Sequence, residues 1–317
     1  MNDSEYATAY APATIGNVGV GYDMLGLAIA GAGDRVSARR IEGSGVTIKE
    51  VRSLDGEIHP ELSTDATQNT ASLAAEALWR EAGESGGVEL IVHKGIPLQS
   101  GMGSSAASAV AGAVAANALL ESPLDKDALL PFALIGEKFA SGGLHADNVA
   151  PSLVGGLVLC PTVFLPTMIR LPIPSGICSV LLHPELEVNT AESRSGLASS
   201  YSMEQWLNQQ GYLAGFIAGC ASNDIDLIGQ SLRDVVIEPQ RAASVPCFAA
   251  VKVAAMEAGA LGCSLSGSGP SIFALCKEEF AVDMASTMEK SCRAAGYECQ
   301  SWISPLDVPG ATVERSA

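Results

Sequence analysis

The segment PLQSGMGSSAA at residues 97–107 carries the residue types that could bind a phosphate group. Its glycines at 101 and 103 free the backbone to curl, so several N–H groups can point at one anion. The serines that follow open an Ala-rich run, and the amides at the start of a helix favour a phosphate. Serine hydroxyls at this point could bind a phosphate or ligate a magnesium ion. The spacing therefore predicts a cradle for a nucleotide triphosphate.

Three other interpretations of this segment follow from its residue types. It is not a Walker-type loop, which needs a lysine after its last glycine, because Ser104 follows Gly103 directly and the nearest lysine is Lys94. A Gly/Ser turn that caps a buried helix would give the same residues and stays open. A membrane span is excluded, because Pro97 and the glycines interrupt the uncharged run 95–120 and the rest is mostly Ala, Gly and Ser.

The composition is typical of a compact globular protein. The chain has 317 residues, of which 48% are hydrophobic and 17% charged, enough for two domains with a substantial core. Its formal net charge of -17 argues against nucleic acid and anionic membranes as partners. The eight cysteines form no Cys-x-x-Cys pair, so we expect buried free thiols in a reducing compartment. The first residues, MNDSE, show no targeting pattern, and we expect a cytoplasmic protein.

Hydrophobic periodicity predicts mixed strands and helices along the chain. The alternating runs 36–41 and 46–51 predict a β-hairpin. Four prolines between 161 and 174 indicate a domain boundary. We expect further strands at 6–10, 88–92, 155–160, 177–182, 271–275 and 298–302, and helices at 70–81, 104–120, 125–140, 191–199, 203–220, 224–234, 246–258 and 281–295. This mixture predicts an α+β protein.

Three motifs give the chain a resemblance to the GHMP kinase superfamily. They are PATIGNVGVGYDMLG at 12–26, PLQSGMGSSAA at 97–107 and GCSLSGSGPS at 262–271. Three further segments resemble the homoserine kinases within that superfamily: SGGLHADNVAP at 141–151, TAESR at 190–194 and VIEPQR at 236–241. Small departures, such as Tyr22 where Phe is frequent and Met102 where Leu is common, remove no polar group that the chemistry needs.

The resemblance implies a two-domain α+β fold, the GHMP kinase fold. Its N-terminal domain, expected at residues 1–163, is ribosomal-S5-like and has a left-handed β-α-β crossover, against the usual right-handed rule. Its C-terminal domain, expected at residues 164–317, is ferredoxin-like. The site is expected in the cleft between them, and a homodimer is what the resemblance suggests.

The resemblance also implies ATP and Mg²⁺ as cofactors and assigns residues to them. Ser105 and Glu137 would be the magnesium ligands, although a glutamate between Gly136 and Lys138 also fits an exposed helix position. Asn69 fits a helix N-cap and also a place near the adenine. The triphosphate would contact the loop Pro97, Leu98, Gln99, Ser100, Gly101, Met102, Gly103, Ser104, Ser105, Ala106 and Ala107.

The same resemblance gives the substrate as L-homoserine, whose carboxylate, ammonium and hydroxyl groups each need a partner. Arg194 and Arg241 can bind the carboxylate in forked geometry, although either arginine could instead form a surface salt bridge. Asp23 can hold the ammonium group. Asn17 and Asn148 can orient the hydroxyl group, and we expect Thr14 and Gly267 to line the same pocket.

His145, Asp147, Asn148 and Asn17 are the candidates for the chemical step. His145 and Asp147 form a general-base dyad or shape the site, and the sequence leaves both readings open. Phosphoryl transfer through a loose transition state demands little activation of the nucleophile. The expected activity is ATP- and magnesium-dependent phosphorylation of the homoserine side-chain hydroxyl, a step towards threonine. The alternatives are a mevalonate or sugar kinase of the superfamily, and a catalytically silent regulator that binds the same ligands.

Overall fold

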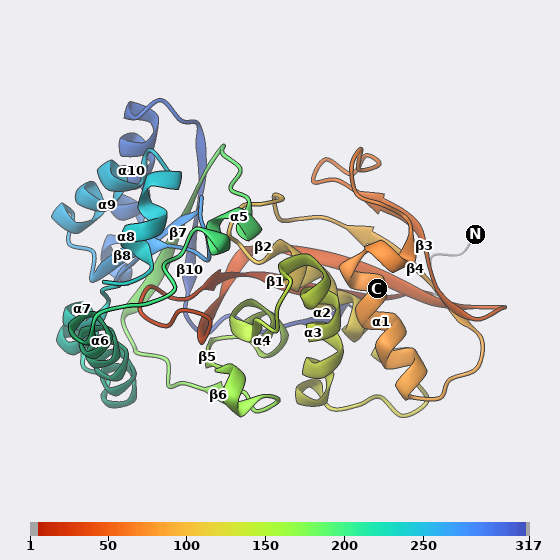
Figure 1. Cartoon of the computed structure of the whole chain (residues 1–317). Helices are drawn as coiled ribbons and strands as arrows, with labels where there is room; N and C mark the ends of the chain where they lie inside the picture. The colour runs from red at the N-terminus through yellow and green to blue at the C-terminus, as the bar shows by residue number, and fades with distance from the viewer. Residues whose placement is uncertain (1–5, 315–317) are drawn as a thin grey trace.

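The computed structural model describes residues 6–314, which form two β-sheets lying next to one another (Figure 1). The larger sheet is built mainly from the first half of the chain and the smaller sheet from the second half. The strands of the larger sheet are β1 (Ala7–Gly16), β2 (Leu25–Ile41), β3 (Gly45–Arg52), β4 (Gly87–His93), β5 (Leu157–Leu159), β6 (Ile169–Arg170) and β11 (Thr312–Glu314).

The larger sheet has the strand order β11-β1-β2-β4-β3, with β5 on β2 and β6 on β5. The predicted hairpin between residues 36–41 and 46–51 is wrong, because β4 lies between β2 and β3. Strand β3 runs parallel to β4, and helix α1 (Thr70–Glu81) makes the connection that a parallel pair requires. This is the β-α-β unit for which the family resemblance implies a left-handed crossover.

Helices α1, α2 (Ser104–Asn117) and α4 (Ala146–Val154) pack on this sheet, and α3 (Leu130–Ser141) packs on these three helices. Helix α2 contacts β1, β2 and all three other helices, and it is buried along nearly its whole length. Its Ala-rich sequence lets the neighbours approach closely: a Cβ at Gly112 would lie 2.3 Å from the carbonyl oxygen of Ala71 on α1. The small residues therefore place the start of α2 deep in the molecule.

The smaller sheet is antiparallel, with the order β10-β7-β9-β8. Its strands and the helices α9 and α10 follow the β-α-β-β-α-β order of a ferredoxin-like domain. The expected fold of the second half is confirmed. The elements are β7 (Ile177–Pro184), α5 (Thr190–Ser195), α6 (Met203–Ser222), α7 (Ile225–Ser231), α8 (Glu238–Arg241), α9 (Phe248–Glu257), β8 (Gly262–Leu265), β9 (Ile272–Lys277), α10 (Ala281–Ala294) and β10 (Cys299–Pro305).

The end of the chain returns to the first sheet, where β11 pairs with β1 in antiparallel register. The division into residues 1–163 and 164–317 stays a prediction. All eight cysteines have free thiols, as expected, and seven of them are buried. Within residues 6–314, no helix combines the length and the apolar character that crossing a membrane would require.

Candidate active site

The three motifs are far apart in the sequence and meet at one place between the sheets. Ser266 Oγ donates to the carbonyl oxygen of Gly101 (2.6 Å), and the N–H of Gly267 donates to that of Gly16 (3.1 Å). The N–H of Thr14 donates to Met102 O (3.0 Å). A cavity of about 370 Å³ opens beside this junction, and residues of all three motifs line it.

The loop before α2 has the backbone that a phosphate cradle requires. Gly101 and Gly103 have φ values of +74° and +69°, which favour glycine. A Cβ at Gly103 would lie 2.2 Å from Thr14 Oγ1, so a larger residue does not fit there. The first backbone bond of α2 runs from Ala107 N–H to Gly103 O (2.9 Å). The three preceding N–H groups, at 104–106, therefore have no partner inside the helix.

Most of the predicted loop residues reach the cavity. Residues 98–101 and 103–105 line it, whereas Met102, Ala106 and Ala107 are buried behind its wall. Pro97 lies on the outer side of the loop, against a second hollow. Asn69 is an N-cap, as predicted, because its Oδ1 accepts from Ala71 N–H (3.0 Å). It also lines the cavity, whereas its place near the adenine stays a prediction.

A buried cation lies beneath the loop, and sequence analysis missed its role. Lys94 lines the cavity, forms an ion pair with Asp34, and donates to Ser108 Oγ (2.7 Å) and to Ser104 O (3.1 Å). Asp34 is fully buried and also accepts from the N–H of Gly95 (2.8 Å). The sequence did offer one signal for this network, because Asp34 is the single acidic residue of strand β2. The network fixes a positive charge next to the first turn of α2.

Glu137 and Ser105 lie together on the wall of the same cavity, as predicted. Glu137 is only 7% exposed, so the exposed-helix alternative is wrong. Burial raises the pKa of its carboxyl to about 7, against a hydrogen bond with Ser105 that lowers it. Its Oε2 atom is buried and finds no hydrogen-bond partner within the part of the chain that the structure describes. An unpartnered carboxylate oxygen beside a serine hydroxyl fits a hard cation such as Mg²⁺.

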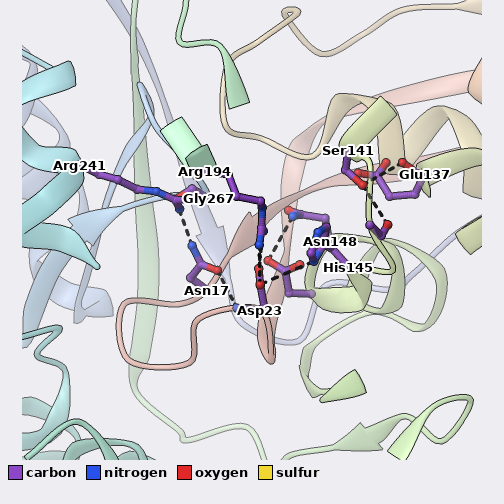
Figure 2. Close-up of polar contacts among 11 residues, drawn as sticks. Asn17, Asp23, Glu137, Ser141, His145, Asn148, Arg194, Arg241 and Gly267 are labelled. Atoms are coloured by element: carbon purple, nitrogen blue, oxygen red, sulfur yellow. Dashed lines mark hydrogen bonds and ion pairs between the residues drawn. The ribbon is translucent and has the colours of Figure 1, made fainter. Parts of the chain in front are cut away.

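The predicted substrate residues gather at the other end of the cavity (Figure 2). Arg194, from α5, forms a two-point ion pair with Asp23 at 2.9 and 2.7 Å. Arg241, at the end of α8, donates to the carbonyl oxygen of Gly267 (3.0 Å) and is 4% exposed. Asn17 Nδ2 donates to the same carbonyl oxygen (3.0 Å). Among the described residues, Arg241 forms no ion pair with a carboxylate.

Helix α4 carries Asp147 and Asn148, two of the predicted catalytic residues, and it begins directly after a third, His145. The Nδ1 atom of His145 lies 3.6 Å from Oδ2 of Asp23, and burial lowers the pKa of this imidazole. Asn148 Oδ1 accepts from Thr14 Oγ1 (2.8 Å), and Asn148 Nδ2 donates to Asp147 Oδ2 (3.3 Å). Thr14 is buried and supports the cavity wall through Asn148.

Asp147 lines the cavity although it is 3% exposed. Burial raises the pKa of its carboxyl to about 7, and the negative charge of Asp23 raises it further, whereas Arg194 lowers it. A carboxyl group with a pKa near neutrality can exchange a proton at the ordinary working pH of an enzyme. Besides Glu137, the cavity thus contains a second carboxyl group whose pKa lies near neutrality.

Comparison with known sequences identifies the family. The GHMP kinases N terminal domain matches residues 69–156 and the GHMP kinases C terminal domain matches residues 216–293. The chain is 41% identical to homoserine kinase of Xylella fastidiosa (strain M12) over 306 residues, which cover 96% of this chain and 93% of that protein. It is 42% identical to homoserine kinase of Chlorobium phaeobacteroides (strain BS1), covering 96% and 98% of the two chains.

Comparison with solved structures gives the same result. The crystal structure of homoserine kinase from Cytophaga hutchinsonii superposes with a TM-score of 0.93 at 39% identity, covering 99% of both chains. Mevalonate kinase of L. major, at 15% identity and a TM-score of 0.68, covers 94% of this chain and 95% of its own and shares the fold. With both motif sets and both domains matched over nearly its whole length, the chain belongs to the homoserine kinase family of the GHMP kinases.

Proposed function

We propose that this protein transfers the terminal phosphoryl group of ATP to the side-chain hydroxyl of L-homoserine, giving O-phospho-L-homoserine. The observation that carries the proposal is that one cavity holds both ends of such a reaction. At one end are the free N–H groups at the start of α2, with Lys94 beneath them. At the other end is Arg241, a buried cation without a carboxylate partner among residues 6–314. The relatives named homoserine kinase support the choice of acceptor.

Each end suits one reactant. Amides at a helix N-terminus and a buried lysine bind the negative charge of a triphosphate without a basic protein surface. An amino-acid carboxylate suits the guanidinium groups of Arg194 and Arg241, and an ammonium group suits Asp23. An uncharged sugar would leave Arg241 buried and unpaired, and mevalonate would offer no ammonium group to Asp23. This is the reason for preferring homoserine to the other acceptors.

Ser105 and Glu137 would hold Mg²⁺, which neutralises charge on the phosphates when bound. Within residues 6–314, no three His, Cys, Asp or Glu side chains gather as a metal site, so further ligands would be phosphate oxygens and water. Asn148 and Asn17 orient the acceptor hydroxyl. Asp147 lies in the same cavity and accepts the hydroxyl proton once its own carboxyl is ionised.

A coupled assay of ADP release tests the proposal. Purified protein is mixed with MgATP and, in separate reactions, with L-homoserine, mevalonate, galactose or no acceptor. We expect ADP release that depends on homoserine. Release that is as fast with mevalonate or galactose would assign another acceptor, and equal release without acceptor would show idle hydrolysis. Binding of homoserine or nucleotide without turnover would support a silent regulator instead.

A further inference from the structure

Tyr22 lies against both arginines of the substrate end of the cavity. The Cζ atom of Arg194 is 5.4 Å from the centroid of the Tyr22 ring, and the Cζ atom of Arg241 is 5.2 Å from it. The two arginines come from different helices, α5 and α8, whereas Tyr22 belongs to the loop between β1 and β2. The ring of Tyr22, in the N-terminal half, therefore contacts two cations of the C-terminal half.

Arg241 needs such a contact because its guanidinium is buried and its hydrogen bond to the carbonyl oxygen of Gly267 supplies no full negative charge. Burial lowers the pKa of its guanidinium, and the like charge of Arg194 lowers it further, whereas Asp23 and Tyr22, the latter also through a side-chain hydrogen bond, raise it. Its Nε atom is buried and has no hydrogen-bond partner among residues 6–314. Asp23, the nearest acidic residue of the loop, already accepts both bonds from Arg194. The electron-rich face of an aromatic ring attracts a guanidinium and offsets part of this cost.

Tyr22 itself is held in place by the turn in which it lies. The N–H of Gly21 donates to Asn17 O (2.9 Å) and the N–H of Leu25 donates to Gly21 O (2.8 Å), which closes the loop on both sides of the tyrosine. Gln209, on α6, donates from Nε2 to Val20 O (2.9 Å) and ties the loop to the C-terminal half. Hydrogen bonds thus hold the backbone on both sides of the ring, and the Tyr22 side chain itself is half-buried.

We infer that Tyr22 is a positioning residue, which holds the guanidinium groups of Arg194 and Arg241 at a fixed spacing to receive the carboxylate of the amino-acid substrate. The inference rests on the proposed function and adds a residue to it. A guanidinium that is already oriented loses less freedom when a carboxylate binds in forked geometry. The ring therefore acts on substrate affinity through the arginines, without contact to the reacting atoms.

Kinetics of three variants test the inference. Tyr22→Leu removes the aromatic face and Tyr22→Phe keeps it. Tyr10→Leu is the matched control, because Tyr10 lies under Arg35 at 4.9 Å in the larger sheet, outside the cavity. For Tyr22→Leu we expect the homoserine KM to rise by ~10-fold, with kcat and the ATP KM changed by less than ~3-fold. Tyr22→Phe restores the homoserine KM to within ~3-fold of wild type, and Tyr10→Leu leaves it unchanged.

Crystal structures of the unliganded wild type and Tyr22→Leu give a second readout that needs no activity. We expect the guanidinium groups of Arg194 and Arg241 to move apart in the variant. Unchanged guanidinium positions, or an unchanged homoserine KM, would overturn the inference, and so would a Tyr22→Phe variant as impaired as Tyr22→Leu. If Tyr22→Leu does not fold, Tyr22→Met is measured in its place. A wild type without homoserine-dependent turnover refutes the proposed function, while the guanidinium positions still judge the role of Tyr22.

Discussion

Arg194 donates two hydrogen bonds to the carboxylate of Asp23, at 2.9 and 2.7 Å, across the substrate end of the cavity. From the sequence, we expect Asp23 to bind the ammonium group of homoserine and Arg194 to bind its carboxylate. In the structure, the two side chains form an ion pair with each other. A bound amino acid can replace this pair with two contacts of the same kind, from its ammonium group to Asp23 and from its carboxylate to Arg194. Substrate binding then replaces the ion pair between Arg194 and Asp23 by two ion pairs with the substrate, so neither side chain is left as an unpaired charge.

This exchange predicts that Asp23→Asn weakens homoserine binding much more than it weakens the fold. We expect a loss of affinity of ~10- to 100-fold, since one charge-assisted contact is removed. The free energy of unfolding should change by less than ~1 kcal/mol, because the side chains of Arg194 and Asp23 are 34% and 24% exposed. Calorimetric titration and chemical denaturation measure the two effects. The control is Asp127→Asn, which breaks an exposed ion pair with Arg170. Equal homoserine affinity in Asp23→Asn and wild type would contradict the exchange of ion pairs.

Arg241→Ala should raise the homoserine KM by ~10- to 100-fold and leave the ATP KM near that of wild type. The reason is that Arg241 is buried, lines the cavity and has no carboxylate partner among the described residues. Arg241→Lys is expected to recover only part of the loss, because a lysine cannot form the forked contact. Steady-state kinetics with each reactant varied in turn measure this. A rise in the ATP KM alone would place Arg241 at the nucleotide instead.

Glu137→Gln should lower kcat by ~100-fold or more and raise the Mg²⁺ concentration needed for half-maximal rate. The variant keeps the size of the side chain but removes the charge whose Oε2 atom lacks a partner in the structure. Ser105→Ala tests the second proposed ligand in the same titration. Glu192→Gln is a matched control on the exposed face of α5. An unchanged magnesium dependence in Glu137→Gln would remove this residue from the metal site.

The raised pKa of the Asp147 carboxyl predicts that the free energy of unfolding decreases as the pH rises towards about 7. The pKa of its carboxyl is raised from 3.8 to about 7 by burial, so between these values the folded chain binds one proton more than the unfolded chain. Its contribution to stability is therefore present at low pH and is lost as the pH rises through about 7, at up to ~1.4 kcal/mol per pH unit. The difference between wild type and Asp147→Asn in denaturation from pH 4 to 8 measures it. A difference that does not vary with pH would contradict the buried titrating carboxyl.

Local sequence patterns predicted most helices and strands but not how the strands pair. Residues 36–41 and 46–51 alternate as strands should, yet alternation says nothing about which strand becomes the neighbour. The insertion of β4 between them depends on α1 packing against the sheet, which is a tertiary effect. Helix α4 was not predicted because Pro151 lies inside it, where a proline removes a helical hydrogen bond.

Motifs in the sequence pointed to some residues of the candidate site. Residues that join the site only through a tertiary contact could not be found in this way. Most residues of the loop at 97–107 line one cavity together with Glu137 and Arg241, and the roles that the motifs gave them stay predictions. The ion pair of Lys94 with Asp34 joins residues 60 positions apart, and no spacing rule foretells it. The contact of Tyr22 with two arginines, and the pairing of Asp23 with Arg194, likewise exist only after α5 and α8 pack against the loop.

A crystal structure with a non-hydrolysable ATP analogue, Mg²⁺ and L-homoserine would show both reactants in the cavity at once. We expect phosphate oxygens within hydrogen-bonding distance of the N–H groups at 104–106, and the homoserine carboxylate on Arg241 and Arg194. We also expect the homoserine hydroxyl between Asp147 and the terminal phosphate. Phosphates bound elsewhere, or homoserine bound away from both arginines, would contradict the proposed function.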